Sequence, residues 1–252
     1  MGNVMVEEIL IAVAILVVGI PLIMNIAGPL IIWKTQKLPA IVKFQPIDDE
    51  SFMEDRNAAF RVYDKSLRKH GFEVIGSSVL QDSHTSSFFR IYWSSKLKVA
   101  AMVVTMKSKV EEVTYLEITQ QYADGTALGV SNSPVTEAYP KHDLKLAFPF
   151  PGITSTLELL LRHAKLKSKY KASARPVDYA VEKGFYDVEE FLRRESDELL
   201  KKGIVKPEID ENGKRALTLR GAYALTYRSI PPGKYIWGYI LQRRADAALR
   251  DA

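Results

Sequence analysis

The chain has 252 residues, enough for one or two domains, and its 47% hydrophobic and 26% charged residues are typical of a globular protein and not of a disordered one. The formal net charge is +5, and the absence of cysteine excludes disulfide bonds, cysteine-ligated zinc, iron–sulfur clusters and thiol catalysis. Four histidines are left to build a metal or acid–base site, and we predict no cofactor.

An uncharged apolar run occupies residues 9–33. About 20 helical residues cross the hydrocarbon core of a lipid bilayer, so this run can span it with some tilt. We predict a retained transmembrane helix. A buried core helix is typically shorter, and a cleaved signal peptide would need basic residues before the run. Gly19, Pro21 and the pair Gly28-Pro29 predict a kink, or an early end of the helix near residue 28.

The two flanks of this run differ in charge. The N-terminal flank, residues 1–8, carries two acidic residues and no basic one, whereas Trp33, Lys34 and Lys37 follow on the other side. An aromatic ring beside lysines that reach the headgroups is typical of an anchor at the membrane interface. By the positive-inside rule, we predict a single-pass protein with its N-terminus outside and its large domain in the cytoplasm.

Residues 34–50 are predicted to be a linker, because two prolines rule out a continuous helix. A domain of mixed α and β structure is expected over residues 51–148. It begins with a helix over residues 51–70, in which Ser51 is the predicted N-cap and apolar side chains recur at helical spacing.

After this helix the apolar period changes to two, the period of a β-strand. Five strands are expected, and the short links between them require antiparallel neighbours, which makes a β-meander with the helix on one face. The strands are expected at residues 72–80, 87–94, 97–106, 113–122 and 126–130. The segment between Pro140 and Pro149 is predicted to be a loop.

Residues 149–252 are predicted to be mainly helical, with a β-hairpin over residues 204–219. Helices are expected at residues 154–164, 177–183, 187–202, 220–228 and 235–250. Overall, the predicted fold class is α+β, with one N-terminal transmembrane helix.

The stretch GIVKPEIDENGKRALTLRG at residues 203–221 is similar to the wing and the following turn of bacterial winged-helix regulators. Three helices followed by a hairpin also resemble a winged-helix domain. The resemblance implies a bacterial inner membrane as the location. The helix over residues 187–202, in the position of the recognition helix, has six acidic and four basic residues, so it would repel phosphates and favours protein contact over nucleic acid.

Residues 162–175 (RHAKLKSKYKASAR) contain six basic residues and no acidic one. They are Arg162, Lys165, Lys167, Lys169, Lys171 and Arg175. One interpretation is a solvated C-terminal helix end, where basic residues are favoured. The other is a segment that binds anionic lipid headgroups or a protein partner. Nucleic acid is disfavoured, because Tyr170 is the only aromatic residue available for stacking.

Local catalytic motifs are absent from the sequence. Asp82-Ser83-His84 contains the residue types of a hydrolase triad, but consecutive residues are better explained as a polar turn. The histidines are too far apart for a helical zinc motif, so we predict no metal site and no catalytic residue. The pair Gly125 and Gly129 lacks the third glycine of a phosphate-binding loop.

These patterns predict a non-enzymatic, membrane-anchored adaptor or scaffold that binds a protein partner or an anionic membrane surface. Two alternatives remain open. A membrane-anchored enzyme with a motif-free site on the β-meander would show a deep polar pocket near residues 82–84, 124–132 or 142–143. A membrane-bound regulator would bind nucleic acid through residues 150–252.

Overall fold

The computed structural model describes residues 7–9, 11–12, 15–81, 85–134, 139 and 143–251, and within them the chain is an α+β protein, as predicted. The chain divides into two compact units. The anchor unit comprises residues 1–40, 136–140 and 196–239. The sheet unit comprises residues 41–135, 141–195 and 240–252.

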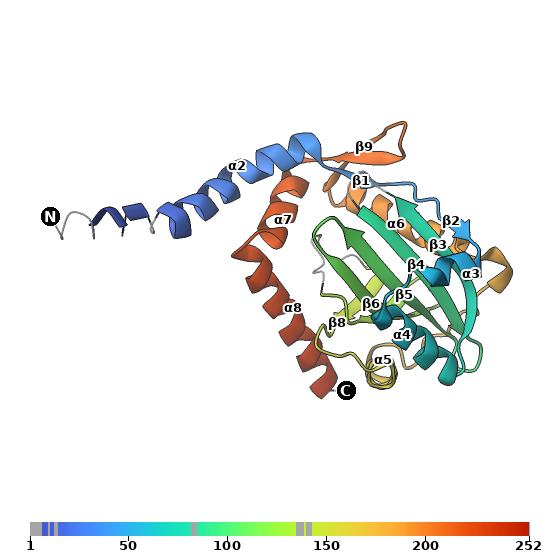
Figure 1. The fold of residues 1–252 in the computed structure, drawn as a ribbon. Helices are drawn as coiled ribbons and strands as arrows, with labels where there is room; N and C mark the ends of the chain where they lie inside the picture. Colours follow the sequence, from blue (N-terminus) through green and yellow to red (C-terminus); the bar gives the residue numbers. More distant parts are fainter. Residues whose placement is uncertain are drawn as a thin grey trace. The chain divides into compact units, whose positions relative to one another are not determined.

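The sheet unit is built on a seven-stranded sheet in the order β2-β3-β4-β5-β6-β7-β8 (Figure 1). All neighbours are antiparallel except β7 and β8, which are parallel. The strands are β2 (Gln45–Ile47), β3 (Glu73–Gln81), β4 (Thr85–Ser94), β5 (Val99–Ser108), β6 (Glu112–Gln121), β7 (Ala127–Ser131) and β8 (Lys145–Pro149). The predicted meander corresponds to β3–β7, and each strand end is within two residues of its prediction.

The structure contains strands where the sequence predicts a loop and a linker. β8 lies in the predicted loop, and the predicted linker contains β1 (Lys37–Pro39) and β2. The prolines that favoured those predictions are tolerated because all three strands lie at a sheet edge, where one row of backbone N–H groups has no partner strand.

Helices cover one face of the seven-stranded sheet. They are α3 (Asp49–Glu54), α4 (Ala58–Lys69), α5 (Thr156–Tyr170) and the last turns of α8 (Gly233–Arg250). Leu67 of α4 and Leu159 of α5 are fully buried in the same core as Leu116 and Leu128 of the strands. Alternation along each strand sends the next side chains, such as Ile91 and Trp93 of β4, to the opposite face.

The single helix predicted over residues 51–70 is two helices. Asn57 caps α4, and its side-chain oxygen accepts a hydrogen bond from the Phe60 N–H at 2.9 Å. Asp48, and not the predicted Ser51, caps α3. Asp48 and Asn57 therefore each start a helix of their own. Each side chain accepts hydrogen bonds from the first backbone N–H groups of its helix, which have no partner within that helix.

The C-terminal elements follow the predicted order with different lengths. α5 extends beyond its predicted end to Tyr170, whereas the helix expected at 177–183 is one 3-10 turn, η2 (Val181–Lys183). The remaining elements are confirmed: α6 (Tyr186–Lys201), β9 (Val205–Ile209), β10 (Lys214–Leu217), α7 (Leu219–Ser229) and α8.

The anchor unit contains the one helix, among the described residues, that is long and apolar enough to cross a membrane. It is formed by a π-helical turn, η1 (Ile15–Gly19), and α2 (Ile20–Thr35). Its most apolar 18 residues have a mean hydropathy of 2.4, and 6% of them are buried. The helix does not end at Gly28-Pro29 as one interpretation predicted. It continues to Thr35, and a proline there removes only one backbone hydrogen bond.

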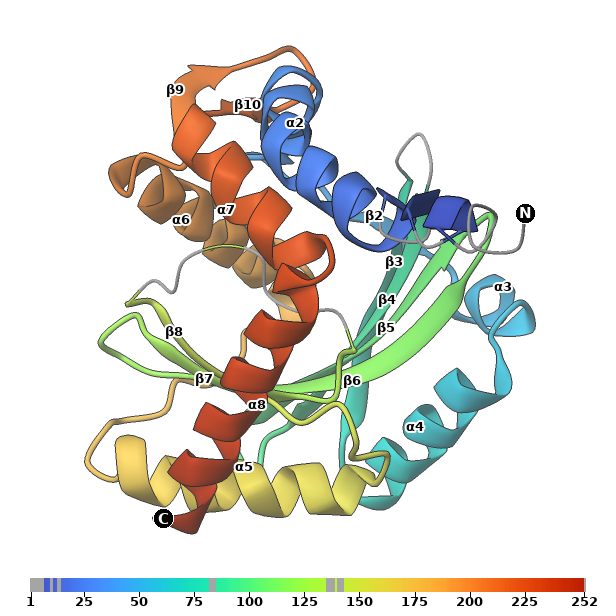
Figure 2. The same cartoon turned by 90° about the vertical axis from the view of Figure 1, so that its left-hand side faces the viewer.

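α2 packs along α7 inside this unit (Figure 2). A Cβ atom on Gly28 would lie 3.2 Å from Thr226 Cγ2, so the missing side chain allows the close approach of the two helices. The unit also has a three-stranded antiparallel sheet in the order β1-β10-β9. Ile204, Leu217 and Ala222 form its fully buried apolar cluster together with Val205.

Candidate functional site

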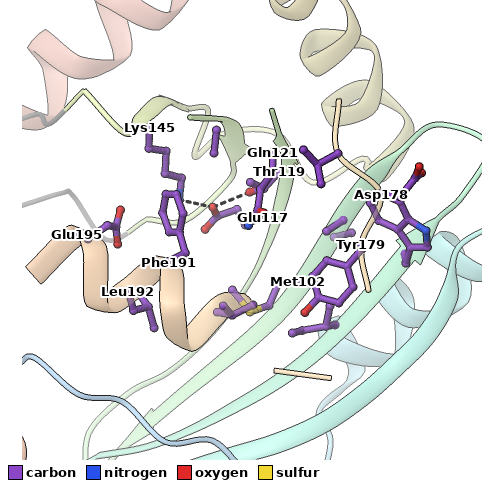
Figure 3. A pocket seen from close by; sticks show the side chains of 17 residues that line it. Met102, Glu117, Thr119, Gln121, Lys145, Asp178, Tyr179, Phe191, Leu192 and Glu195 are labelled. Carbon is purple, nitrogen blue, oxygen red and sulfur yellow. Dashed lines mark hydrogen bonds and ion pairs between the residues drawn. The ribbon is translucent and has the colours of Figure 1, made fainter. Parts of the chain in front are cut away.

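A cavity of about 160 Å³ lies inside the sheet unit, on the face opposite α4 and α5 (Figure 3). Strands β4–β8 provide one side of it, and residues 177–195, which include the first half of α6, provide the other. For comparison, an engineered protein cavity of about 150 Å³ holds benzene. The cavity therefore has the size for a small organic molecule.

Two side chains of α6 connect this wall to other parts of the sheet unit by hydrogen bonds. Glu189 accepts bonds from Lys43 Nζ and from the Phe44 N–H, both at 2.8 Å. Arg194 Nη2 donates to the carbonyl oxygen of Gly125 at 2.8 Å. The wall is thus connected to the chain before β2 and to the turn between β6 and β7, which defines the width of the cavity.

Most of the cavity surface is apolar. Tyr179 packs against Trp93 with ring centroids 5.8 Å apart, and its hydroxyl donates to the carbonyl oxygen of Gly184. Burial, followed by the charge of Asp187, raises the pKa of Tyr179 above its ordinary value. The remaining large apolar side chains are Ile91, Met102, Val177, Val188, Phe191 and Leu192.

One end of the cavity is polar. Lys145 Nζ of β8 donates to Glu117 Oε1 of β6 at 2.5 Å, and the Thr119 hydroxyl donates to the same oxygen at 3.0 Å. Burial raises the pKa of Glu117, but the ammonium charge of Lys145 and the two hydrogen bonds outweigh it, so this pKa lies below its ordinary value. Glu117 is therefore a carboxylate at neutral pH.

Gly129 allows this ion pair to form across an intervening strand. β7 lies between β6 and β8, and the Lys145 side chain passes over Gly129 to reach Glu117. A Cβ atom on Gly129 would lie 2.9 Å from Lys145 Cε and 3.4 Å from Glu117 Oε1. The glycine is explained by this close packing and not by backbone conformation, since Gly129 does not have a positive φ.

The second carboxylate oxygen of Glu117 remains an open acceptor. Both hydrogen bonds to this side chain arrive at Oε1, and no donor in the described part of the chain reaches Oε2. The cavity lining contains three carboxylates, with Asp178 and Glu195, against the single ammonium of Lys145. The charge of Asp178 is offset by Lys98 at 2.8 Å. The cavity thus offers an anionic acceptor at the end of an apolar chamber.

The six basic residues of 162–175 fall into two groups. Arg162 pairs with Glu158 at 2.7 Å, Lys169 lies 3.7 Å from Asp251, and Lys171 lies 3.1 Å from Asp124. The other three make no ion pair with the described residues: Lys165, Lys167 and Arg175. Half of the predicted surface is thus occupied by bonds within the sheet unit.

The predicted interfacial anchor lies at the end of α2 and in β1. Trp33 is partly buried against the apolar cluster of the anchor unit, and Lys206 Nζ lies 5.8 Å from its ring centroid. Lys37 forms an ion pair with Asp210 at 2.8 Å, whereas Lys34 is exposed. Of the three, Lys34 is the side chain that is both charged and without an ion pair in the described residues.

The residues considered for catalysis are not brought together. Asp82, Ser83, His84 and His142 lie outside the described residues. Of the ranges in which an enzyme would show a deep polar pocket, the observed cavity contains only Ala127, and it is mainly apolar. No group of three or more metal-ligating side chains occurs in the searched part of the chain, which is its described part.

Sequence reasoning missed Glu117 and Lys145, since the predicted loop between Pro140 and Pro149 contained Lys145. A glycine inside a predicted strand signals close approach of another group, and Gly129 was considered only as a member of a phosphate-binding motif. No family model, curated protein or solved structure matches the chain. Its function is therefore inferred from the geometry of the site.

Proposed function

We propose that the chain is a non-enzymatic, membrane-anchored binding protein whose sheet unit takes up a small organic cation, an ammonium group on an apolar body. The observation that carries this proposal is Glu117 Oε2, an anionic acceptor with no donor among the described residues, at the polar end of the apolar cavity.

An ammonium group satisfies the site better than a neutral or an acidic one. It donates a charge-assisted hydrogen bond to the carboxylate, and such bonds are about twice as strong as neutral ones. Aromatic faces, which Trp93, Tyr179 and Phe191 provide, attract cations further. An acidic ligand would have to displace Glu117 from Lys145, the one ammonium in the cavity lining.

The geometry favours binding over catalysis. Lys145 holds Glu117 ionised and lowers its pKa, which makes the carboxylate a weak general base near neutral pH. The lining contains neither histidine nor serine that could act as base or nucleophile. A ligand that enters this cavity would be retained and released unchanged.

The membrane location is part of the proposal. α2 exposes most of its apolar side chains, and Lys34 follows at its C-terminal end. Arg220 and Arg228 lie on α7, which packs along α2. By the positive-inside rule, these three basic residues favour a cytoplasmic C-terminal side and an N-terminus outside.

A winged-helix-like role in protein contact is the second candidate. Its support is that β1 completes a three-stranded sheet with the β9–β10 hairpin, between α6 and α7 in the sequence. Acidic residues of α6 pair with basic residues of the same helix, such as Glu190 with Arg193 at 2.7 Å and Glu198 with Lys201 at 2.7 Å. This favours a protein surface over nucleic acid as the partner.

The test is calorimetric titration of the full chain in detergent micelles with three matched probes: benzylammonium, benzyl alcohol and benzoate. We expect benzylammonium to bind most tightly and benzoate least. Glu117→Gln should weaken benzylammonium binding about tenfold or more, because one hydrogen bond to a charged group is lost. The affinity for benzyl alcohol should not change. Glu111→Gln, in the turn before β6, removes the same charge outside the cavity and is the control.

A second variant tests the cavity itself. Ala100→Leu adds three carbon atoms to the cavity lining and should abolish binding of both benzylammonium and benzyl alcohol. Thermal unfolding in the same micelles shows whether each variant is folded. Benzoate binding more tightly than benzylammonium, or benzylammonium binding that is equal in the parent and in folded Glu117→Gln, would contradict the proposal.

A further inference from the structure

Four exposed tyrosines lie on α7 and on the first turns of α8, all within the anchor unit. Tyr223 and Tyr227 are four residues apart on α7, as are Tyr235 and Tyr239 on α8, so each pair lies on one face of its helix. Their exposed fractions range from 50% for Tyr223 to 69% for Tyr235. Exposed tyrosines in such number indicate a surface that another phase or molecule covers.

The same segment is basic and free of acidic residues. Residues 219–239 (LRGAYALTYRSIPPGKYIWGY) contain Arg220, Arg228 and Lys234 but neither aspartate nor glutamate. The Arg228 guanidinium lies 4.1 Å from the ring centroid of Trp237. Aromatic rings among basic residues form the composition of helices that lie at a membrane surface.

The segment is fixed beside the last turns of α2. Gly28 packs against this segment: a Cβ atom there would lie 3.2 Å from Thr226 Cγ2 and 3.7 Å from Ile230 Cδ1. Asn25 Nδ2 donates to the carbonyl oxygen of Pro231 at 3.5 Å. The end of α7 and the start of α8 are therefore held at the level of residues 25–28 of the apolar helix.

That level is close to the membrane interface if α2 crosses the bilayer. Gly28 and Asn25 precede Trp33 by five and eight residues, which is about 8 and 12 Å along a helix. An apolar run of 25 residues, such as 9–33, would be about 37 Å long as a continuous helix, which exceeds a hydrocarbon core of about 30 Å. The last turns of the run can therefore lie among the headgroups, where tyrosine and tryptophan are enriched.

We infer that the tyrosine face of residues 219–239 lies in the interfacial region of the bilayer that α2 crosses. The phenol groups lie at the headgroups, and Arg220, Arg228 and Lys234 face anionic phosphates. This inference rests on the membrane anchoring of the proposed function and is independent of the ligand cavity. α7 and the start of α8 then form a second, non-spanning contact with the same membrane.

The absence of cysteine makes a depth measurement direct. Single-cysteine variants Tyr227→Cys and Tyr239→Cys of the full chain would be nitroxide-labelled and reconstituted into vesicles of phosphatidylcholine and phosphatidylglycerol. Paramagnetic resonance then compares label exposure to oxygen, which concentrates in the bilayer, with exposure to a water-soluble nickel chelate. Ile23→Cys in α2 and Asn212→Cys in the exposed β9–β10 turn are the membrane and water controls.

We expect labels at positions 227 and 239 to be several-fold less accessible to nickel than the label at 212, and to lie between the two controls in oxygen exposure. If Ile23 is in the bilayer while both tyrosine positions are as nickel-accessible as 212, the inference is wrong and the anchor stands. If Ile23 is also aqueous, the anchoring itself fails. Labels shielded from both reagents would show a protein cover, which also overturns the inference. Tyr223→Cys and Tyr235→Cys repeat the test where a first variant does not fold.

Discussion

Each face of the seven-stranded sheet carries an ion pair. The two pairs differ in how many of their carboxylate oxygens accept a hydrogen bond. On the helix-covered face, Arg90 is 1% exposed and bridges Asp49 and Asp64. Both oxygens of each carboxylate accept a bond: Ser77 donates to Asp49, and Tyr92 and Arg68 donate to Asp64.

On the cavity face, the Glu117–Lys145 pair is filled on one carboxylate oxygen only. Around Arg90 every carboxylate oxygen accepts a bond, and the atom without a hydrogen-bond partner among the described residues is the buried donor Arg90 Nε. A ligand for these carboxylates would have to displace an existing bond. A charge with an open acceptor beside empty space has a bond left for a ligand. We therefore interpret the Arg90 cluster as structural and the Glu117 pair as a binding site.

The largest expected effect is that of removing Arg90. Arg90→Leu removes the cation that Asp49 and Asp64 share. Breaking a buried pair typically costs about 3–5 kcal/mol, and we expect the lower end of this range because the Asp49 side chain is 54% exposed and Asp64 keeps Arg68. Thermal unfolding of the full chain in micelles measures the loss. Arg68→Gln, whose side chain is 50% exposed, removes a surface partner of the same Asp64 and should cost at most about 1 kcal/mol. Equal losses in the two variants would contradict the interpretation of Arg90 as the structural cation of this cluster.

The next effect concerns a buried histidine on the helix-covered side. His163 of α5 is 3% exposed, and its Nε2 has no hydrogen-bond partner among the described residues. Burial, and then the charge of Lys167, lowers the pKa of His163 from 6.5 to about 4, although a bond with the backbone of Leu128 opposes this. The folded state therefore takes up a proton less readily than the unfolded state.

The sign of the pH dependence follows from that difference. Between about pH 6.5 and pH 4 the unfolded chain binds the proton and the folded chain does not, so stability falls as the pH falls through this window. The loss is about 3 kcal/mol for a shift of this size. His163→Leu should lack this part of the loss when unfolding of the two proteins is compared at pH 7 and pH 4. An identical pH dependence in both would contradict the assignment.

A smaller effect is expected at Gly129, which tests how the Glu117–Lys145 pair on the cavity face is positioned. Gly129→Ala places a methyl group 2.9 Å from Lys145 Cε, and such overpacking typically costs about 1–3 kcal/mol. The displaced ammonium should also raise the Glu117 pKa, measurable by nuclear magnetic resonance of the carboxylate. Gly152→Ala is the control, since a Cβ atom there meets nothing within 4 Å. An unchanged pair in Gly129→Ala would show that the glycine is not needed.

The smallest effect on stability is expected for the basic segment of α5. Lys165→Glu combined with Arg175→Glu should change the free energy of unfolding by no more than about 0.5 kcal/mol, because neither side chain forms an ion pair among the described residues. If the segment binds anionic headgroups, each residue contributes about 1 kcal/mol of attraction. A fluorescent label at Ser168→Cys, quenched by headgroup-labelled anionic lipid, would report contact that the double variant loses. Absent quenching would indicate a solvated helix end, and quenching that is unchanged in the double variant would show that these two residues do not provide the contact.

The sequence predicted the meander well because its signals are local. Alternating apolar residues and the Asp124-Gly125 turn define β3–β7 without reference to distant parts of the chain. The cavity could not be predicted in the same way. Glu117 and Lys145 are 28 residues apart, and they meet only because β8 pairs in parallel with β7 and Gly129 leaves room above it. Parallel pairing at an edge leaves no turn signature in the sequence.

The prolines of the edge strands have a consequence for how this protein can associate. Each of the four edge strands of the two described sheets contains one: Pro39 in β1, Pro207 in β9, Pro46 in β2 and Pro149 in β8. Proline offers no N–H to an incoming strand, and edges of this kind resist the sheet-to-sheet pairing that leads to aggregation. Any partner of this chain would therefore have to rely more on side chains than on strand addition, because each of these edges lacks at least one backbone donor.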